Sequence, residues 1–217
     1  MINLYNEDCL EAMKRMEDGK YDLAIVDPPY GINMDGDIYG ERKPSKKWNR
    51  PQKKDYDNKQ WDNKRPSKEY FDELIRISKN QIIFGGNYFT DLIPVSGGWF
   101  VWDKGINENM TLSMGELAWI SKTNSVKIKK FLWSGFAKCE QVNRIHPTQK
   151  PVELYRWILQ NYAKEGDTIL DTHLGSGSIA IACHDMGYSL DGYELDVDYF
   201  EAASKRLQEH QRQLKLF

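Results

Sequence analysis

The sequence predicts an α/β fold with a doubly wound, mostly parallel β-sheet of the Rossmann-like type. The chain has 217 residues, which suits one domain with a sizeable buried core. Predicted strands and helices alternate through most of its length, and this pattern is typical of parallel sheets covered by helices. Residues 23–26 are apolar in succession, as in a strand that is buried on both faces.

Each predicted element has a local reason. Asp8 and Ser67 stand before apolar residues at helical spacing, so each is expected to cap a helix. Pro151 is expected at the first position of a helix, where its missing N–H is not needed. The predicted helices cover residues 9–16, 67–78, 151–162, 177–187 and 197–214. The predicted strands cover residues 2–5, 21–26, 81–84, 98–103, 116–121, 126–133, 168–171 and 188–193.

The composition excludes several classes of protein. Thirty Lys and Arg against 32 Asp and Glu leave a net charge of −2, so any contact with nucleic acid must come from a local patch. Cys9, Cys139 and Cys183 are too scattered for a disulfide scaffold or a metal-binding motif, and they suit a reducing compartment. The longest apolar run has five residues, and residues 1–8 lack a signal sequence. We therefore expect a cytoplasmic protein without a metal site.

A glycine-rich loop follows the predicted strand at residues 168–171. Gly175 and Gly177 would allow a tight turn and a close approach of the backbone to a ligand at the start of a helix. Glu194 stands nineteen positions after Gly175, where an acid binds ribose hydroxyls in nucleotide-binding units. The alternative to a nucleotide-binding site is an ordinary tight turn beside a surface acid. A nicotinamide dinucleotide would suit the motif equally well, but only 23 residues follow Glu194, too few for a second set of strands.

A second polar motif, Asp27-Pro28-Pro29-Tyr30, follows the predicted strand at residues 21–26. Ligands of open α/β sheets lie beyond the carboxyl ends of the strands. The two prolines lack N–H donors, so the local carbonyl groups only accept hydrogen bonds. A carboxylate, a carbonyl and an aromatic ring together would bind a flat molecule with an exocyclic amine. The alternative is an ordinary proline turn after a strand.

Six parts of the chain resemble one known family, and together they span nearly its whole length. The family is the amino-directed, S-adenosylmethionine (SAM)-dependent DNA methyltransferases in their permuted, beta-class order. In this order the catalytic half comes first and the cofactor half last, so the resemblance implies a circularly permuted methyltransferase sheet. The matching parts are residues 4–10, 21–31, 102–104 with 116–119, 146–151, 171–178 and 192–196.

The resemblance implies roles for the residues that match the motifs. Glu194 would bind the ribose of SAM, and Asp8 would approach its adenine. Thr148 and Lys150 would reach the methionine carboxylate, and Asp171 with the two glycines would shape the methionine pocket. The catalytic residues would be Asp27, Pro28, Pro29 and Tyr30, with Tyr30 stacking on the target base. The cofactor-binding residues would be Asp8, Asp27, Thr148, Lys150, Asp171, Gly175, Gly177 and Glu194.

The chain departs from the family in one place. Thr172-His173 stands where the family usually carries Pro-Phe. A histidine at such a position is more often a packed loop residue than a catalyst, so the sequence assigns no role to His173.

The reaction that the resemblance implies is methyl transfer from SAM to N6 of an adenine flipped out of duplex DNA. Cytosine N4 methylation is the alternative, although its motif more often begins with Ser than with Asp. RNA or protein-amide methyltransferases usually place the cofactor loop before the catalytic motif. A non-catalytic DNA-binding module is opposed by the intact Asp27, Tyr30 and Glu194. The resemblance also suggests a homodimer and a cognate restriction endonuclease as partners.

Residues 31–66 have no apolar period and include a basic stretch directly after the catalytic motif. This loop and a small middle region at residues 98–145 are the expected DNA-contacting parts of one domain over residues 1–217. The stretch is either a solvated face or a clamp on DNA phosphates, with Trp48 able to stack or wedge. Lys127, Lys129 and Lys130 are a second candidate contact. The basic residues are Arg42, Lys43, Lys46, Lys47, Arg50, Lys53 and Lys54.

A salt titration of DNA binding tests the phosphate clamp. Each Lys or Arg that contacts a phosphate displaces a condensed counterion. The logarithm of the DNA affinity then falls by about 0.9 units per log unit of salt for each such contact. Replacing Lys46, Lys47, Lys53 and Lys54 with Ser should flatten the slope by up to about 3–4 units and weaken specific and nonspecific DNA alike. Identical slopes for the wild type and the variant would mean that the stretch is only a solvated face.

Overall fold

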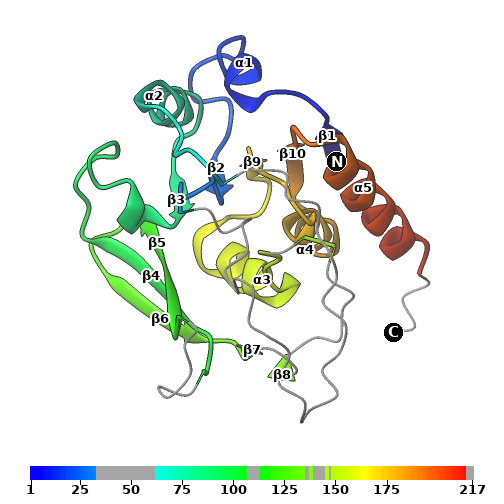
Figure 1. Ribbon diagram of the computed structural model, residues 1–217. Coiled ribbons are helices and arrows are strands. Elements are labelled where there is room, and N and C mark those ends of the chain that lie inside the picture. The colour runs from blue at the N-terminus through cyan, green and yellow to red at the C-terminus, as the bar shows by residue number, and fades with distance from the viewer. Residues whose placement is uncertain (33–61, 107–112, 135–136, 139–144, 147, 214–217) are drawn as a thin grey trace, which may run out of the picture.

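An eight-stranded sheet lies at the centre of the protein (Figure 1). The computed structural model describes residues 1–32, 62–106, 113–134, 137–138, 145–146 and 148–213. The strand order is β1-β10-β9-β2-β3-β5-β4-β6. β5 runs antiparallel to both of its neighbours, and the other pairings in this sheet are parallel. The predicted α/β class with a mostly parallel sheet is therefore confirmed, while circular permutation remains a prediction.

The strands agree closely with the expected ranges. Strand β6 ends three residues earlier than expected, and the short pair β7 and β8 was not predicted. The strands of the main sheet are β1 (Ile2–Tyr5), β2 (Leu23–Val26), β3 (Gln81–Phe84), β4 (Gly98–Asp103), β5 (Gly115–Ile120), β6 (Val126–Lys130), β9 (Thr168–Asp171) and β10 (Ser189–Tyr193). The second sheet pairs β7 (Trp133–Ser134) with β8 (Ala137–Lys138).

The predicted helices also form, although α1 ends three residues earlier than expected. Asp8 accepts hydrogen bonds from the backbone of Leu10 and Glu11, and Ser67 accepts one from Tyr70, so both residues are N-caps. Pro151 was expected at the first helical position but lies one residue earlier, as the N-cap. The helices are α1 (Cys9–Met13), α2 (Lys68–Ile77), α3 (Val152–Tyr162), α4 (Ser178–Met186) and α5 (Val197–Arg212), with a short 3₁₀ helix η1 (Gly86–Tyr88) that was not predicted.

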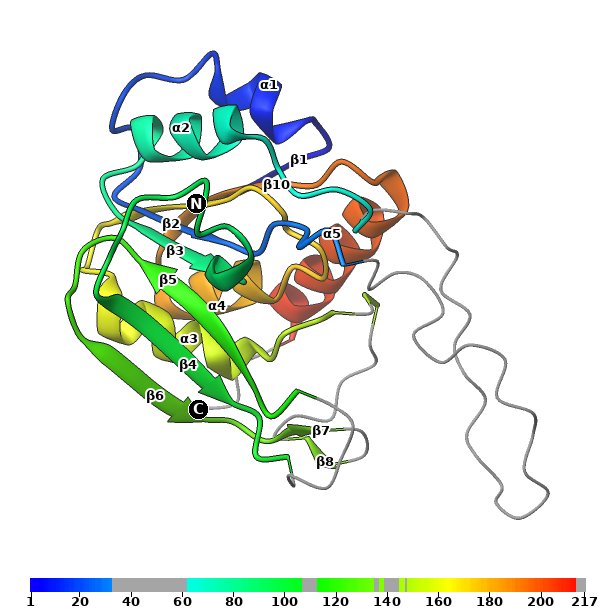
Figure 2. The same cartoon turned by 60° about the vertical axis from the view of Figure 1, so that its left-hand side comes forward.

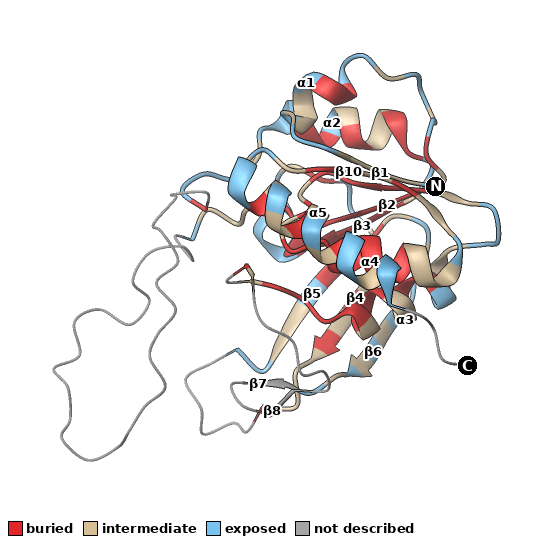
Figure 3. Ribbon diagram, turned by 90° about the vertical axis from the view of Figure 1, so that its right-hand side faces the viewer, coloured by how far each residue is buried: buried red, intermediate tan, exposed pale blue. Residues whose placement is uncertain are grey.

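Helices cover both faces of the sheet. α1 and α2 lie on one face, and α3, α4 and α5 lie on the other (Figures 1 and 2). Alternate residues of a strand point to opposite faces, so Leu23 and Ile25 of β2 join the core under α3 to α5, whereas Ala24 and Val26 join the core under α1 and α2. Buried residues follow this layering along the strands and the inner sides of the helices (Figure 3).

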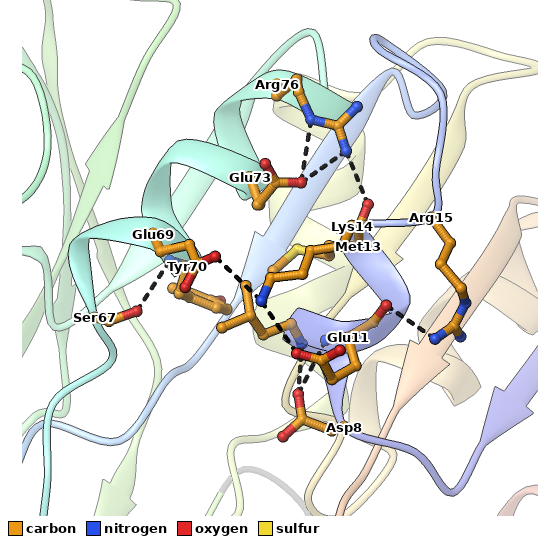
Figure 4. A network of polar contacts seen from close by, with 11 residues as sticks. Asp8, Glu11, Met13, Lys14, Arg15, Ser67, Glu69, Tyr70, Glu73 and Arg76 are labelled. Carbon is orange, nitrogen blue, oxygen red and sulfur yellow. Dashed lines mark hydrogen bonds and ion pairs between the residues drawn. The ribbon is translucent and has the colours of Figure 1, made fainter.

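Ion pairs and hydrogen bonds join α1 to α2 at the rim of the core that these two helices cover (Figure 4). Arg76 of α2 donates to the backbone oxygens of Met13 and Met16, at 2.9 and 2.8 Å, and pairs with Glu73. Lys14 pairs with Glu69 at 3.1 Å. These contacts fix the segment after Asp8 against α2. None of the described helices is both long and apolar enough to cross a membrane.

Candidate functional site

The predicted site residues gather at one edge of the sheet. Parallel strands β2, β9 and β10 carry Asp27, Asp171 and Glu194 at or just beyond their carboxyl ends. Antiparallel β5 begins at this same edge, which adds Glu116 to the group. Strand β4 is antiparallel to β5, so it ends at the edge where β5 begins. Lys104 directly follows β4 and therefore also belongs to this group of residues. Strand direction thus brings together segments of the chain that are far apart in sequence.

A cavity of about 720 Å³ opens at this edge, within the usual size range of small-molecule sites. We call it the cofactor cavity. Asp171 and Gly177 are not among the residues that line it, so their expected contacts with a cofactor remain predictions. Six of the eight predicted cofactor-binding residues line it: Asp8, Asp27, Thr148, Lys150, Gly175 and Glu194.

Glu194 holds the glycine-rich loop in place. One of its carboxylate oxygens accepts a hydrogen bond from the Gly175 N–H at 2.8 Å, and the other accepts one from the Asp196 N–H at 3.0 Å. Burial raises the pKa of Glu194 above its ordinary value, and the two backbone N–H groups oppose the rise. Gly175 and Gly177 have φ angles of 51° and 69°, a conformation that favours glycine.

Asp171 lies beneath the loop, 2% exposed. Burial raises its pKa to about 8, and the charges of Asp27 and Glu194 add to the rise. The N–H of His173 donates to Asp171 Oδ1 at 3.0 Å, which partly opposes the shift. The carboxyl group is therefore largely protonated at neutral pH, and its bond to His173 shapes the turn.

A second cavity, of about 360 Å³, adjoins the first, and we call it the base cavity. Tyr30, Tyr88, Lys104 and Glu116 lie on its wall. The two cavities have four lining residues in common, so a molecule in one would meet a molecule in the other at this boundary. The shared residues are Asp27, Pro29, Thr148 and Lys150.

Asp27 stands at this boundary with both carboxylate oxygens engaged. The Tyr30 hydroxyl donates to Oδ1 at 2.7 Å, and the Lys150 ammonium group pairs with Oδ2. The ring of Tyr30 stacks on Tyr88, with 4.9 Å between centroids. One face of Tyr30 is thus covered by another ring, and stacking on a target base remains a prediction for this residue.

Lys150 is buried, with only 4% of its side chain exposed. Its ammonium nitrogen lies 3.5 Å from Glu116 Oε2 and 4.5 Å from the centre of the Phe84 ring. Burial lowers the pKa of Lys150, but the charges of Asp27 and Glu116 outweigh it and hold the pKa above its ordinary value. Lys150 is therefore a buried cation, and its expected contact with a cofactor carboxylate remains a prediction.

Glu116 extends this chain of charges to Lys104. Glu116 Oε1 lies 2.6 Å from the Lys104 ammonium nitrogen. Burial raises the pKa of Glu116, but the charges of Lys150 and Lys104 outweigh it, so the net pKa is below the ordinary value. The sequence matched residues 102–104 and 116–119 only as strands. It carries no signal that antiparallel pairing places these two charged residues beside Asp27.

His146 was also missed as a site residue. It lines the cofactor cavity beside Thr148, whose hydroxyl lies 3.0 Å from His146 Nδ1. Burial lowers the pKa of His146 to about 4, and the charge of Lys150 adds to the effect, so the ring is neutral at pH 7. The signal for it was the match of residues 146–151 to the family.

The candidate DNA contacts are only partly placed. All seven basic residues between positions 42 and 54, and Trp48, lie outside the described residues. Lys130 ends β6 opposite Asp103, at the sheet edge of the two cavities. Lys127 lies over the Tyr162 ring at 4.9 Å, and Lys129 lies over the Phe131 ring at 5.6 Å. Within the described part of the chain, no group of His, Cys, Asp or Glu is arranged to hold a metal ion.

Replacing Glu194 with Gln tests the cofactor cavity. A carboxamide has one oxygen for the two backbone N–H groups and lacks the charge that favours ribose hydroxyls. The loss of charge-assisted hydrogen bonds should weaken SAM binding by roughly 10- to 100-fold. Calorimetry with SAM measures this effect, with the exposed Glu165→Gln as control. Equal affinities for the Glu194 variant and the wild type would show that this cavity does not bind a nucleoside.

Known proteins are similar to this chain in sequence and in fold. The chain is 24% identical to the type II methyltransferase M.HpaI of Haemophilus parainfluenzae, over 92% of this chain and 72% of that protein. Its fold is similar to that of M1.HpyAVI in complex with SAM, with a TM-score of 0.61 and 19% identity over 95% of this chain and 100% of that one. PvuII DNA methyltransferase, which is cytosine-N4-specific, gives a TM-score of 0.61 and 12% identity over 100% and 88% of the two chains.

The family model for DNA methylases matches residues 99–205, from β4 to α5. This part includes Lys104, the buried Lys150, the glycine-rich loop and Glu194. The Asp27-Pro28-Pro29-Tyr30 motif precedes the matched residues in sequence. It lines the same two cavities as residues from the matched part. On this evidence residues 99–205 form a DNA methylase domain of the N6/N4 family.

Proposed function

We propose that the chain transfers the methyl group of SAM to the N6 amino group of an adenine in duplex DNA. The observation that carries the proposal is the position of Asp27, which lines both the cofactor cavity and the base cavity. A SAM molecule in the larger cavity and a flipped base in the smaller one would meet at this residue. The residues of the cofactor cavity suit SAM, since Asp8 and Glu194 would offer carboxylate acceptors to its hydroxyl groups and the buried cation Lys150 lies at the boundary of the two cavities.

The chemistry requires the adenine amino group to become a better nucleophile. Its lone pair is delocalised into the ring, and acceptance of its two N–H bonds by the Asp27 carboxylate and the Pro28 carbonyl would localise it. SAM supplies an electrophilic methyl group when it is bound. Tyr30 and Lys150 hold the Asp27 carboxylate in place, so the acceptor is fixed before the base arrives. Most of the rate would come from this alignment of the two reactants.

The base must leave the duplex to reach Asp27. The base cavity has room for a flat heterocycle, and the stacked rings of Tyr30 and Tyr88 form an aromatic wall on one side. Lys130 and the basic residues between positions 42 and 54 are the proposed phosphate contacts. Gly31 donates its N–H to the buried Asp62 at 2.8 Å. This bond joins the two ends of the loop at residues 31–66 beside the base cavity.

Adenine is favoured over cytosine because the motif begins with Asp27 rather than Ser. The fold itself does not choose between the bases, since a cytosine-N4 enzyme has a similar fold. Both bases also present an amino donor beside a ring nitrogen acceptor. The similarity to a type II methyltransferase supports a companion restriction endonuclease as part of the proposal.

Nucleoside analysis of methylated DNA tests the proposed function. Unmethylated plasmid DNA incubated with the protein and SAM should yield N6-methyldeoxyadenosine after digestion. Asp27→Ala should lose at least ~100-fold of the rate while it keeps SAM binding to a useful degree, because one preorganised acceptor is removed. Asp18→Ala, at an 80% exposed side chain, should match the wild type. N4-methyldeoxycytidine as the product would overturn the choice of base, and near-normal turnover of Asp27→Ala would overturn the role of Asp27.

A further inference from the structure

His173 lies in the loop between β9 and α4 and lines the cofactor cavity. It stands where the family usually carries Phe, and the sequence assigned it no role. Its ring is edge-on to Tyr70 of α2, with 5.4 Å between centroids. Tyr70 lies more than a hundred positions earlier in the chain, so only the fold brings the two rings together.

A chain of hydrogen bonds runs from Tyr70 through Thr172 to His173. The Tyr70 hydroxyl lies 2.6 Å from the Thr172 hydroxyl, which lies 2.9 Å from His173 Nδ1. Tyr70 is 3% exposed, and Thr172 is the only partner that the described residues give its hydroxyl. A buried hydroxyl hydrogen without an acceptor is costly, so we assign Tyr70 as the donor to Thr172 and Thr172 as the donor to Nδ1. Nδ1 is thus an acceptor, and the ring proton of His173 lies on Nε2.

His173 is neutral at pH 7, since burial lowers its pKa to about 4 while the charge of Asp8 partly opposes this effect. Nε2 has no hydrogen-bond partner among the described residues. His173 itself lines the cofactor cavity. The hydrogen-bond chain therefore presents a fixed N–H donor to whatever fills this end of the cavity.

We propose that His173 binds the adenine ring of SAM by donating its Nε2–H to a ring nitrogen. Asp8 lines the same end of the cavity, close enough for its charge to act on His173. An acceptor and a donor side by side match adenine, which carries its N6 amino donor between two ring acceptors. Tyr70 and Thr172 are positioning residues, since they act through His173. This inference rests on SAM as the cofactor.

His173→Phe is the first test. It restores the residue that the family usually carries and keeps a flat ring, but it removes the donor. Loss of one neutral hydrogen bond should weaken SAM binding by roughly 3- to 10-fold in calorimetry. His184→Phe, in α4 and away from the lining residues, is the matched control and should bind SAM as the wild type does. Unchanged affinity in His173→Phe would overturn the proposal and show that the ring only packs.

Tyr70→Phe and nitrogen-15 NMR of the imidazole are the second test. The free wild-type protein should show His173 as the neutral tautomer with its proton on Nε2. Tyr70→Phe removes the first donor, so Thr172 no longer has a fixed direction, and a mixture of tautomers should appear with weaker SAM binding. A proton on Nδ1 in the wild type, or an unchanged tautomer in the variant, would contradict the hydrogen-bond chain.

The His173→Phe binding test and the nucleoside analysis of methylated DNA together separate this inference from the proposed function. If His173→Phe weakens SAM binding and the DNA product is N4-methyldeoxycytidine, the choice of adenine as substrate fails and the role of His173 stands. If the product is N6-methyldeoxyadenosine and His173→Phe binds SAM like the wild type, the proposed function stands and the role of His173 fails.

Discussion

A buried ammonium group between two carboxylates organises the functional edge of this protein. Burying a charge costs several kcal/mol unless it is paired, so Lys150 requires both Asp27 and Glu116. The three residues come from the entry to α3, the end of β2 and the start of β5. Their pairing therefore fixes the relative positions of segments that no local interaction would join, and it places Asp27 at the boundary of two cavities.

The sheet provides the frame for this cluster. The order β9-β2-β3-β5 sets the glycine-rich loop beside the Asp27 motif, although about 140 residues separate them in sequence. Glu194 then ties the loop to the end of β10 through the Gly175 N–H. The cofactor cavity and the base cavity are consequences of these two arrangements: one lies over the loop, and the other lies beside the antiparallel strand β5.

Local chemistry made much of this predictable. The caps at Asp8 and Ser67 and the apolar runs of β2 and β3 are visible in short windows of sequence, and they form as expected. The charges around Lys150 were not predictable in this way, because Glu116 reaches the site only through an antiparallel register. The contact between His173 and Tyr70 could not be predicted for a similar reason, since Tyr70 belongs to a distant helix.

The rate of methyl transfer in Lys150→Met tests most directly whether the buried cation positions Asp27. The measurement is a single turnover at saturating SAM and DNA, with circular dichroism confirming a folded protein and the exposed Lys164→Met as control. Removing the cation frees the Asp27 carboxylate, so the rate should fall by roughly 10- to 100-fold, as loss of a preorganised group does, while SAM affinity changes less. An unchanged rate in Lys150→Met would contradict this account, because Asp27 would then keep its catalytic position without the buried cation.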